Sequence, residues 1–407
     1  MDMKERNLET LKKKSHRDLV TLDQKTKGHI SEWRPSFGFK PVTGDISDYK
    51  KKYNEITGTV MEKLAKMKEN ENLVISPLSI IMLLAIAADA TNGITRDEIV
   101  NLIGQGISYN RLMDALAMIR KKTLASGSLL SSNAVCVNNN ISHSISEGYE
   151  DRLKEVFDGR LFSSADMVRD VNAWVEEKTK GMIKDAVDES TKDMLACLMN
   201  AIAFEAEWLD QYEEDDIYTG EFHNADGTVS EVQMLRSFDD KYIDDESYIG
   251  FVKPYRDKKY AFMALLPKEK DSSCLSKELM KIDFTKLFTN ASFYGVAVNM
   301  PEFKYDFGED LSDLFKELGI NTMFSAKADF SPMSSEWLKV DSIIHKAHIE
   351  IDRKGTKAAA AAIAYLGVGA APCLDYKTVC LDRPFVYAII NTETELPVFT
   401  GIYNHAD

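Results

Sequence analysis

Hydrophobic side chains recur at three- and four-residue steps directly after residue 45, which predicts a helix. The repeating positions are Tyr49, Tyr53, Ile56, Val60, Leu64 and Met67. A short strand and a buried helix should follow, because the stretch Leu73–Ala88 is almost entirely apolar and yet too short to span a bilayer. Residues 95–98 are Thr-Arg-Asp-Glu, a capping-box pattern that predicts a further helix with Thr95 as its N-cap.

The rest of the chain alternates between helix and strand patterns. We predict helices over 146–156, 169–184 and 309–318, and strands over 133–137, 195–204, 259–266, 293–300, 347–352, 384–390 and 397–402. The near-continuous apolar run at 195–204 indicates a strand covered on both faces. No fixed repeat and no Pro- or Ser-rich linker divides the chain. We therefore expect a single mixed α+β domain over 45–407, after a polar extension at 1–44 that we expect to be mobile.

Composition narrows the classes of function. The 407 residues include 50 Lys and Arg against 65 Asp and Glu, which gives a net charge of −15. Such acidity argues against nucleic acid or an anionic membrane as the main partner. It also favours a solvated helix end over a heparin-binding surface for the basic residues 120–122. The 44% of hydrophobic residues excludes disorder throughout.

The cysteines and the N-terminus bear on the cellular compartment. The five cysteines are Cys136, Cys197, Cys274, Cys373 and Cys380. Their odd number and the lack of a C-x-x-C pair predict isolated thiols, although Cys373 and Cys380 are close enough in sequence to pair. The first residues have no signal-peptide core, so we expect a cytoplasmic protein, or an extracellular one if a leader is missing from this chain.

Motifs of common enzymes are missing from the sequence. It contains no H-E-x-x-H, no G-x-S-x-G and no P-loop, and the glycines at 367 and 369 do not complete a dinucleotide loop. A hydrolase with a Ser/His/Asp triad would lack its nucleophile elbow. We therefore expect neither an enzyme nor a metal or cofactor site.

One alanine-rich segment has an unusual setting. Residues 354–364 are Lys-Gly-Thr-Lys, five alanines, Ile and Ala, and a glycine-containing stretch follows at 365–372. Five alanines favour a short surface helix by propensity. However, an alternating strand pattern precedes them, and small side chains fit easily between strands already in place. The second interpretation is a segment that changes from an exposed loop to an inserted strand.

An ordered set of motifs carries a resemblance to a known family. It comprises Asn72–Ser79, then Asn172, Trp174, Val175, Thr179, Gly181 and Ile183, then Asn200–Phe204 with Trp208, Leu318–Ile320, Phe324, Ala328–Ser331, His345–Ala347, Gly355–Thr356, Arg383–Phe385 and Phe399–Gly401. From about residue 46 to residue 404, the chain resembles the serpins, the serine-protease-inhibitor fold.

The resemblance implies an α+β fold with three β-sheets, eight or nine helices and an exposed reactive-centre loop at about 353–382. A serine protease cleaves this loop and forms an acyl-enzyme with it. The N-terminal part of the loop then inserts into the main sheet as a new strand, which drags the protease across and distorts its active site. The expected partner is thus a target serine protease held in a covalent complex by a monomeric inhibitor without a cofactor.

The resemblance also assigns a hinge where insertion starts. Its residues are Gly355, Thr356, Ala358, Ala359, Ala360, Ala361 and Ala362. In an inserted strand, Thr356, Ala358, Ala360 and Ala362 would face the core, and Lys357 would face the other way. A charged or bulky side chain at an inward position would slow insertion. None is present, which favours an inhibitor over a non-inhibitory carrier or chaperone.

Two further regions are implied to hold the uncleaved state. The first, which we call the shutter, consists of Ser76, Ser79, Asn200 and His345. The second, the breach, consists of Trp208, Glu302 and Arg353. The family usually has a glutamate at the position of Arg353 and a lysine at that of Glu302. The exchanged charges predict an ion pair of reversed polarity, or else two independent solvated charges.

The position of the scissile bond follows from spacing. Counting from the hinge places it at Gly369–Ala370, whereas counting back from Pro384 places it nearer Cys373. No Arg or Lys lies in residues 366–373, so an elastase-like or subtilisin-like target is expected. A cysteine protease that cuts near Cys373 is an open alternative.

Overall fold

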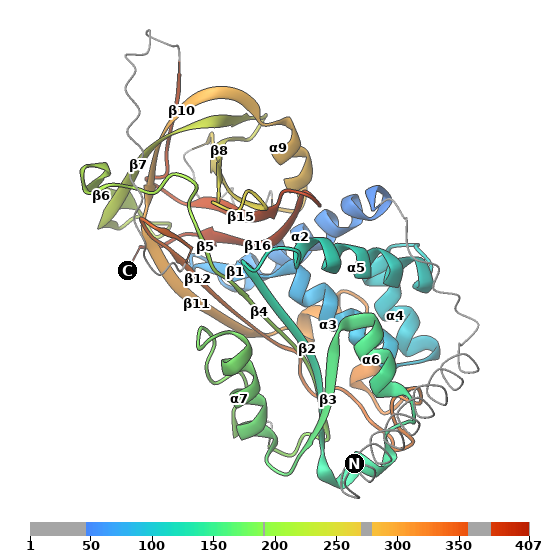
Figure 1. Cartoon of the computed structure of the whole chain (residues 1–407). Helices are drawn as coiled ribbons and strands as arrows, with labels where there is room; N and C mark the ends of the chain where they lie inside the picture. The colour runs from blue at the N-terminus through green and yellow to red at the C-terminus, as the bar shows by residue number, and fades with distance from the viewer. Residues whose placement is uncertain (1–45, 190–191, 270–278, 357–375, 407) are drawn as a thin grey trace, which may run out of the picture. The chain divides into compact units, whose positions relative to one another are not determined.

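The computed structural model describes residues 46–189, 192–269, 279–356 and 376–406 (Figure 1). The extension at 1–44, the hinge alanines 358–362 and the segment 366–373 with the predicted scissile bond lie outside these residues. No helix among the described residues is long and apolar enough to cross a membrane.

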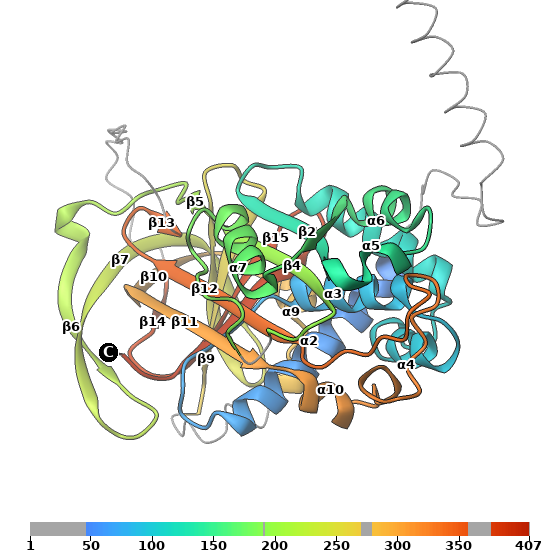
Figure 2. The same cartoon turned by 90° about the horizontal axis from the view of Figure 1, so that it is seen from below.

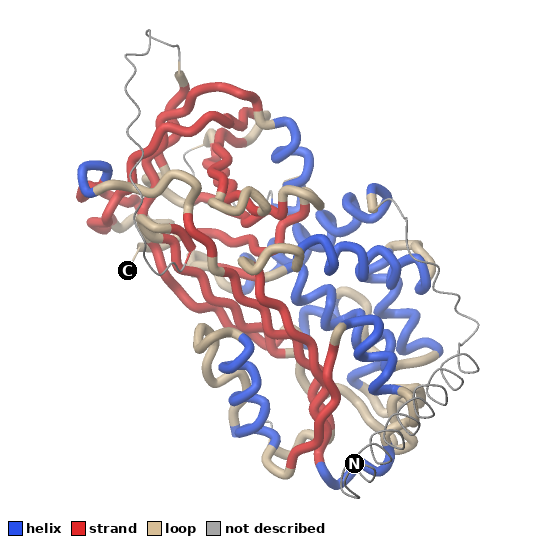
Figure 3. Tube along the Cα trace, viewed as in Figure 1, coloured by secondary structure: helices blue, strands red, loops and turns tan. Residues whose placement is uncertain are grey.

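Most helices gather on one side of the molecule (Figure 3). The α-helices are α2 (Ser47–Met67), α3 (Pro77–Ala90), α4 (Gly93–Gly104), α5 (Tyr109–Thr123), α6 (Tyr149–Phe157), α7 (Met167–Lys178), α9 (Phe284–Asn290) and α10 (Ser312–Glu317). Short 3-10 turns are η1 (Asn139–Ser144), η3 (Glu214–Asp216), η5 (Leu279–Lys281) and η6 (Thr322–Phe324).

The largest sheet has nine strands. Its order is β1 (Leu73–Ile75), β16 (Leu396–Tyr403), β15 (Phe385–Asn391), β9 (Tyr260–Pro267), β8 (Tyr248–Pro254), β7 (Val229–Asp244), β10 (Ser292–Pro301) and β14 (Lys377–Cys380), and β6 (Ile217–His223) pairs with β7. Strands β15 and β16 are buried along their whole length and form the centre of the core.

The structure also has two smaller sheets, one of four strands and one of three. One has the order β11 (Phe303–Asp310), β12 (Ile344–Ile351), β13 (Gly355–Thr356) and β5 (Ala206–Glu207). The other has the order β3 (Gly159–Ser164), β2 (Leu129–Asn138) and β4 (Ala196–Phe204). Because β4 leads directly into β5, the chain passes from one small sheet to the other at residue 205.

Helices cover both faces of β4. Helix α3 starts at an N-cap, Ser76, whose hydroxyl accepts the N–H of Ser79, with Pro77 in the first turn. It is buried almost completely and belongs to the large core cluster. Helix α7 packs on the opposite face of β2 and β4 in a second, smaller cluster (Figure 2). The strand predicted at 195–204 is therefore flanked as the sequence indicates.

The predicted capping box at Thr95 is wrong. Helix α4 starts at Gly93, two residues earlier, with Asn92 at the N-cap position. The Thr95 hydroxyl instead accepts the N–H of Asp329, and the Glu98 carboxylate accepts the N–H of Thr322 at 2.7 Å. Both side chains are used for tertiary contacts, which a local pattern does not reveal.

Candidate functional site

Strands β4 and β12 border an opening, which we call the gap. Within the described residues no pair joins β4 to β12, and they belong to different sheets. At one end the gap is closed by β13, in which Gly355 pairs with Glu207 and Thr356 pairs with both Ala206 and Ile351. The two hinge residues described in the structure thus already occupy the place of a strand between β12 and β5.

A cavity of about 110 Å³ lies in the gap. Its walls come from α3, from α7 and residues 183–187 that follow it, and from β4 and β12. Most lining residues are aliphatic, and polar or charged side chains contribute from Ser79, Asn200, Asp341, Ser342, His345 and Lys346. An apolar space between two unpaired strand edges is suited to a strand with small side chains.

The hinge turn is built for close approach. Asp352 accepts the N–H groups of Lys354 and Gly355 through its carboxylate, and its own N–H bonds to the Gly355 carbonyl. A Cβ on Gly355 would lie 2.1 Å from the carbonyl oxygen of Ala206, so only glycine fits. The Thr356 side chain faces the core, 2% exposed, and its hydroxyl lies 2.6 Å from the Tyr255 hydroxyl.

Three of the four shutter residues meet beneath the sheet. The backbone N–H of Ser76 donates to Nε2 of His345 at 3.2 Å, and the Ser76 hydroxyl donates to the Val398 carbonyl and accepts the N–H of Ser79. Nε2 therefore carries no proton, and the imidazole is neutral. Burial lowers the pKa of His345 to about 4, which keeps the ring neutral at physiological pH.

Asn200 does not join this cluster. Its amide Nδ2 donates to Asn133 at 2.6 Å and to Ser131 at 3.3 Å, both on β2. Its buried Oδ1 accepts no hydrogen bond, and both Asn200 and His345 line the cavity from opposite sides of the gap. The shutter is thus divided by the gap that it was expected to control.

Trp208 ties the breach to the hinge. The indole is fully buried and donates from Nε1 to the Asp352 carbonyl at 2.8 Å, while its backbone N–H donates to the Lys354 carbonyl at 2.9 Å. The ring stacks on Tyr255 with centroids 4.6 Å apart. Because Tyr255 also contacts Thr356, the indole and the hinge threonine are joined through one tyrosine.

The exchanged charges of the breach lie next to each other. The Arg353 N–H donates to Oε1 of Glu302 at 3.0 Å, and its Nε lies 3.7 Å from the same oxygen. The guanidinium also contacts Glu214 at 2.7 Å. Its side chain is 38% exposed, so the ionic part contributes less than about 1 kcal/mol, and the backbone bond is the more specific contact.

Similarity to known proteins agrees with this geometry. The sequence profile of the serpin (serine protease inhibitor) family matches residues 51–406. The chain belongs to the serpin family. As such it is not an enzyme, and the predicted serpin fold is confirmed. Within the described residues the gap separates the two small sheets of this serpin.

Individual relatives cover nearly all of the serpin domain. A serine protease inhibitor of Cyanea capillata is 31% identical over 354 residues, which cover 81% of this chain and 91% of that protein. The crystal structure of a thermophilic serpin, tengpin, in the native state has a TM-score of 0.81 at 30% identity and covers 90% of this chain and 97% of its own. Its latent state gives a TM-score of 0.75 at 28% identity, with 90% of this chain and 100% of its own covered.

Sequence reasoning missed a buried ion pair next to the breach. Lys253 on β8 is 3% exposed, and its Nζ lies 3.4 Å from Oδ1 of Asp239 and 4.7 Å from the ring centre of Tyr212. The N–H of Tyr212 in turn donates to the Arg353 carbonyl. A single lysine in an otherwise apolar strand was the available signal, but its partner depends on the pairing of β7 with β8.

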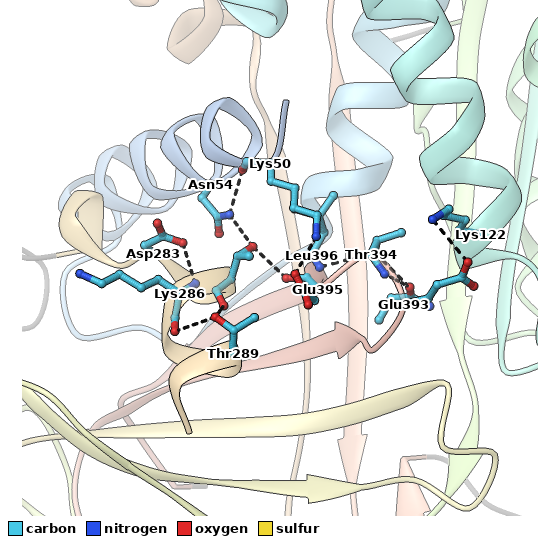
Figure 4. A network of polar contacts seen from close by, with 12 residues as sticks. Lys50, Asn54, Lys122, Asp283, Lys286, Thr289, Glu393, Thr394, Glu395 and Leu396 are labelled. Carbon is cyan, nitrogen blue, oxygen red and sulfur yellow. Dashed lines mark hydrogen bonds and ion pairs between the residues drawn. The ribbon is translucent and has the colours of Figure 1, made fainter. Parts of the chain in front are cut away.

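The basic end of α5 is neutralised by acidic side chains. Arg120 lies 3.4 Å from Asp158, and Lys122 lies 3.4 Å from Glu393 in the turn between β15 and β16 (Figure 4). The preference for a solvated helix end over a heparin-binding surface stays a prediction. Cys136, Cys197 and Cys380 are free thiols, whereas Cys373 lies outside the described residues. No metal-binding cluster of His, Cys, Asp and Glu is found in the part of the chain that the structure covers.

Proposed function

We propose that this serpin is a suicide-type inhibitor of serine proteases that traps its target by inserting the cleaved reactive loop into the gap. The observation that carries the proposal is the gap between β4 and β12, which among the described residues is unpaired and closed only by the hinge residues Gly355 and Thr356. A strand that continued β13 would satisfy both free edges.

The chemistry belongs to the protease. Its serine hydroxyl attacks the carbonyl carbon of Gly369, and the hydroxyl proton passes through the protease's general base to the Ala370 nitrogen as the peptide bond breaks. The new amino terminus at Ala370 belongs to the fragment that carries β14, β15 and β16. Gly369 is then held in an ester to the protease. The 15 residues from Gly355 to Gly369 span roughly 50 Å when extended, which is enough to cross the sheet with the protease attached.

The small inward side chains support an inhibitor over a carrier or chaperone. Thr356 faces the core as the alternation requires, and the following inward positions in the sequence are alanines. Small side chains match a cavity of this size and mainly aliphatic lining without a desolvation cost. The absence of Arg and Lys from 366–373 supports an elastase-like or subtilisin-like target.

The proposal is tested by incubating the protein with pancreatic elastase, with subtilisin and with the cysteine protease papain. Denaturing gel electrophoresis should show a covalent complex with at least one serine protease, and mass spectrometry of the released peptide should place the cut within 366–373. A complex with papain alone would assign a cysteine protease as target. Cleavage without any complex would indicate a non-inhibitory serpin.

Thr356→Arg provides a matched variant for the same experiment. A charged side chain at this buried position cannot enter the core without losing its hydration, so insertion should be slower than hydrolysis of the acyl-enzyme. We expect the variant to be cleaved as a substrate, with at least about tenfold less complex, since 1.4 kcal/mol corresponds to a factor of ten. Thr356→Ser keeps the hydroxyl and should still inhibit. Equal inhibition by the arginine variant would contradict the role given to the hinge.

A further inference from the structure

An aromatic surface, formed by Phe238, Phe293 and Tyr376, covers the outer side of β7, β10 and the start of β14. The three side chains are 62%, 80% and 56% exposed. Solvent exposure of several large apolar rings in one place is uncommon on a monomeric protein and marks interaction sites. The structure described so far gives these side chains no function.

The rings are held in place by their neighbours. Phe238 makes an edge contact with Tyr376, with centroids 6.0 Å apart. It also lies over Gly295, where a Cβ would come within 2.6 Å of the phenylalanine ring. The Lys241 ammonium lies 5.4 Å from the centre of the Phe293 ring. Phe238 and Tyr376 therefore pack against each other and Phe238 against β10, whereas Phe293 is mostly exposed beside Lys241.

Basic side chains accompany the aromatic ones. Arg236 lies over Tyr218 at 4.9 Å, and Lys377 lies over Tyr294 at 5.6 Å. Acidic residues are present on the same strand, since Asp239 and Asp240 directly follow Phe238 and Asp240 is exposed. Aromatic residues and arginine are the types most enriched at the energetic centres of protein interfaces. The composition thus fits a protein partner.

The position of the aromatic surface next to the reactive loop indicates which protein binds there. Tyr376 directly precedes β14, which carries the C-terminal end of the reactive loop and pairs with β10 at Val296 and Lys377. Five residues lie between Ala370 and Tyr376, so the six steps along the chain span at most about 20 Å. A protease of about 230 residues has a radius of gyration of about 17 Å, so a protease at the predicted scissile bond reaches this surface.

We propose that Phe238, Phe293 and Tyr376 form a docking surface for the target protease outside the reactive loop, an inference that rests on the proposed inhibitory function. The surface lies on the nine-stranded sheet, away from the gap. It accelerates and prolongs the encounter with the protease, while the partition between inhibition and hydrolysis is decided at the gap.

The test compares the double variant Phe238→Ser/Phe293→Ser with Trp337→Ser. Trp337 is 54% exposed and lies three residues after Ser334, which bridges to Ile145, the residue directly after η1. With whichever of elastase and subtilisin reacts faster with the wild-type protein, the double variant should show a 5- to 20-fold lower second-order rate constant of complex formation. Its stoichiometry of inhibition should be unchanged, and Trp337→Ser should match the wild type in both.

The outcomes separate this proposal from the function on which it rests. Complex formation at the wild-type rate in the double variant would overturn the docking surface and leave the inhibitor intact. A concentration-dependent dimer, detected by light scattering and lost in the double variant while the rate stays constant, would assign the surface to a second copy of this chain and also overturn the proposal. Absence of complexes with any serine protease would overturn both proposals.

Discussion

The protonation state of His345 is coupled to one buried hydrogen bond of the shutter. Its imidazole accepts a hydrogen bond from Ser76 only while neutral, because a protonated ring has two donors and no acceptor. The neutral form persists to a pH well below the usual range since burial lowers the pKa to about 4. The remaining shutter polar group, Asn200 Oδ1, has no hydrogen-bond partner across the gap.

This lowered pKa predicts a pH dependence of stability. The unfolded chain protonates His345 near pH 6.5 and the folded chain near pH 4, so its contribution is complete above pH 6.5 and is lost as the pH falls toward 4. A difference of about 2.5 pKa units corresponds to about 3 kcal/mol as an order of magnitude. His345→Gln, which is neutral throughout, should show a smaller decrease in melting temperature between pH 7 and pH 4.5. Parallel melting curves for both proteins would contradict a neutral, buried His345.

The reversed charges of the breach make a second prediction for single residues. Arg353→Glu places like charges next to Glu302 and Glu214 and should lower the melting temperature by about 1–3 °C and accelerate polymerisation on heating. The double variant Glu214→Lys/Arg353→Glu restores one opposite pair, keeps the Glu302 carboxylate that accepts the N–H of residue 353, and should recover part of the loss. Differential scanning fluorimetry and native gels measure both effects. If Arg353→Glu behaves as the wild type, the two charges are independent.

The elements around the gap show what a sequence can and cannot predict. The run at 195–204 predicted a strand covered on both faces, and β4 is such a strand except that Ala196–Leu198 are only half-buried beside the gap. Its composition suits the state in which the gap is filled. By contrast, β7 and β6 were missed, because outward polar residues such as Gln233 weaken the apolar signal of an amphipathic strand.

Boundaries and side-chain pairs depend on contacts between distant segments. The helix predicted at 309–318 begins only at Ser312, since β11 extends to Asp310 and the Asp310 carboxylate accepts the Ser312 N–H. The shutter and breach residues were identified through family motifs, in which their spacing is characteristic. Tyr255 and the Lys253–Asp239 pair were not, because their roles arise from strand register that no local pattern specifies.

Helix α7 and residues 183–187 that follow it line the cavity in the gap. Asn172 on α7 is hydrogen-bonded to Val187 in this segment. Its amide accepts the Val187 N–H at 2.9 Å and donates to the Val187 carbonyl at 2.8 Å. Asn172→Ala removes both bonds, about 2 kcal/mol in total, so hydrogen exchange at the Val187 amide should become at least about tenfold faster. Asn172→Asp keeps only the acceptor and should be intermediate. Equal protection in all three proteins would show that Asn172 does not hold this segment.

At the scale of the whole molecule, the uncleaved serpin has an incomplete main sheet. Two strand edges face each other across a cavity, and the segment able to fill it is bound at the hinge by Gly355 and Thr356 alone among the described residues. Unpaired edges and empty apolar space both raise the free energy of a fold. Inhibition as proposed depends on this difference in free energy between the uncleaved and the inserted states.

The most direct test is the melting temperature before and after a single cut in the loop between Tyr365 and Cys373. Insertion of the freed strand should raise the melting temperature by at least about 4 °C, because about 3–5 kcal/mol divided by an unfolding entropy of about 0.8 kcal/mol per degree gives about 4–6 °C for a domain of this size. Nicked Thr356→Arg, in which insertion is opposed, should show a much smaller rise. A nicked wild-type protein that melts at the same temperature as the intact one would contradict a metastable sheet completed by its own loop.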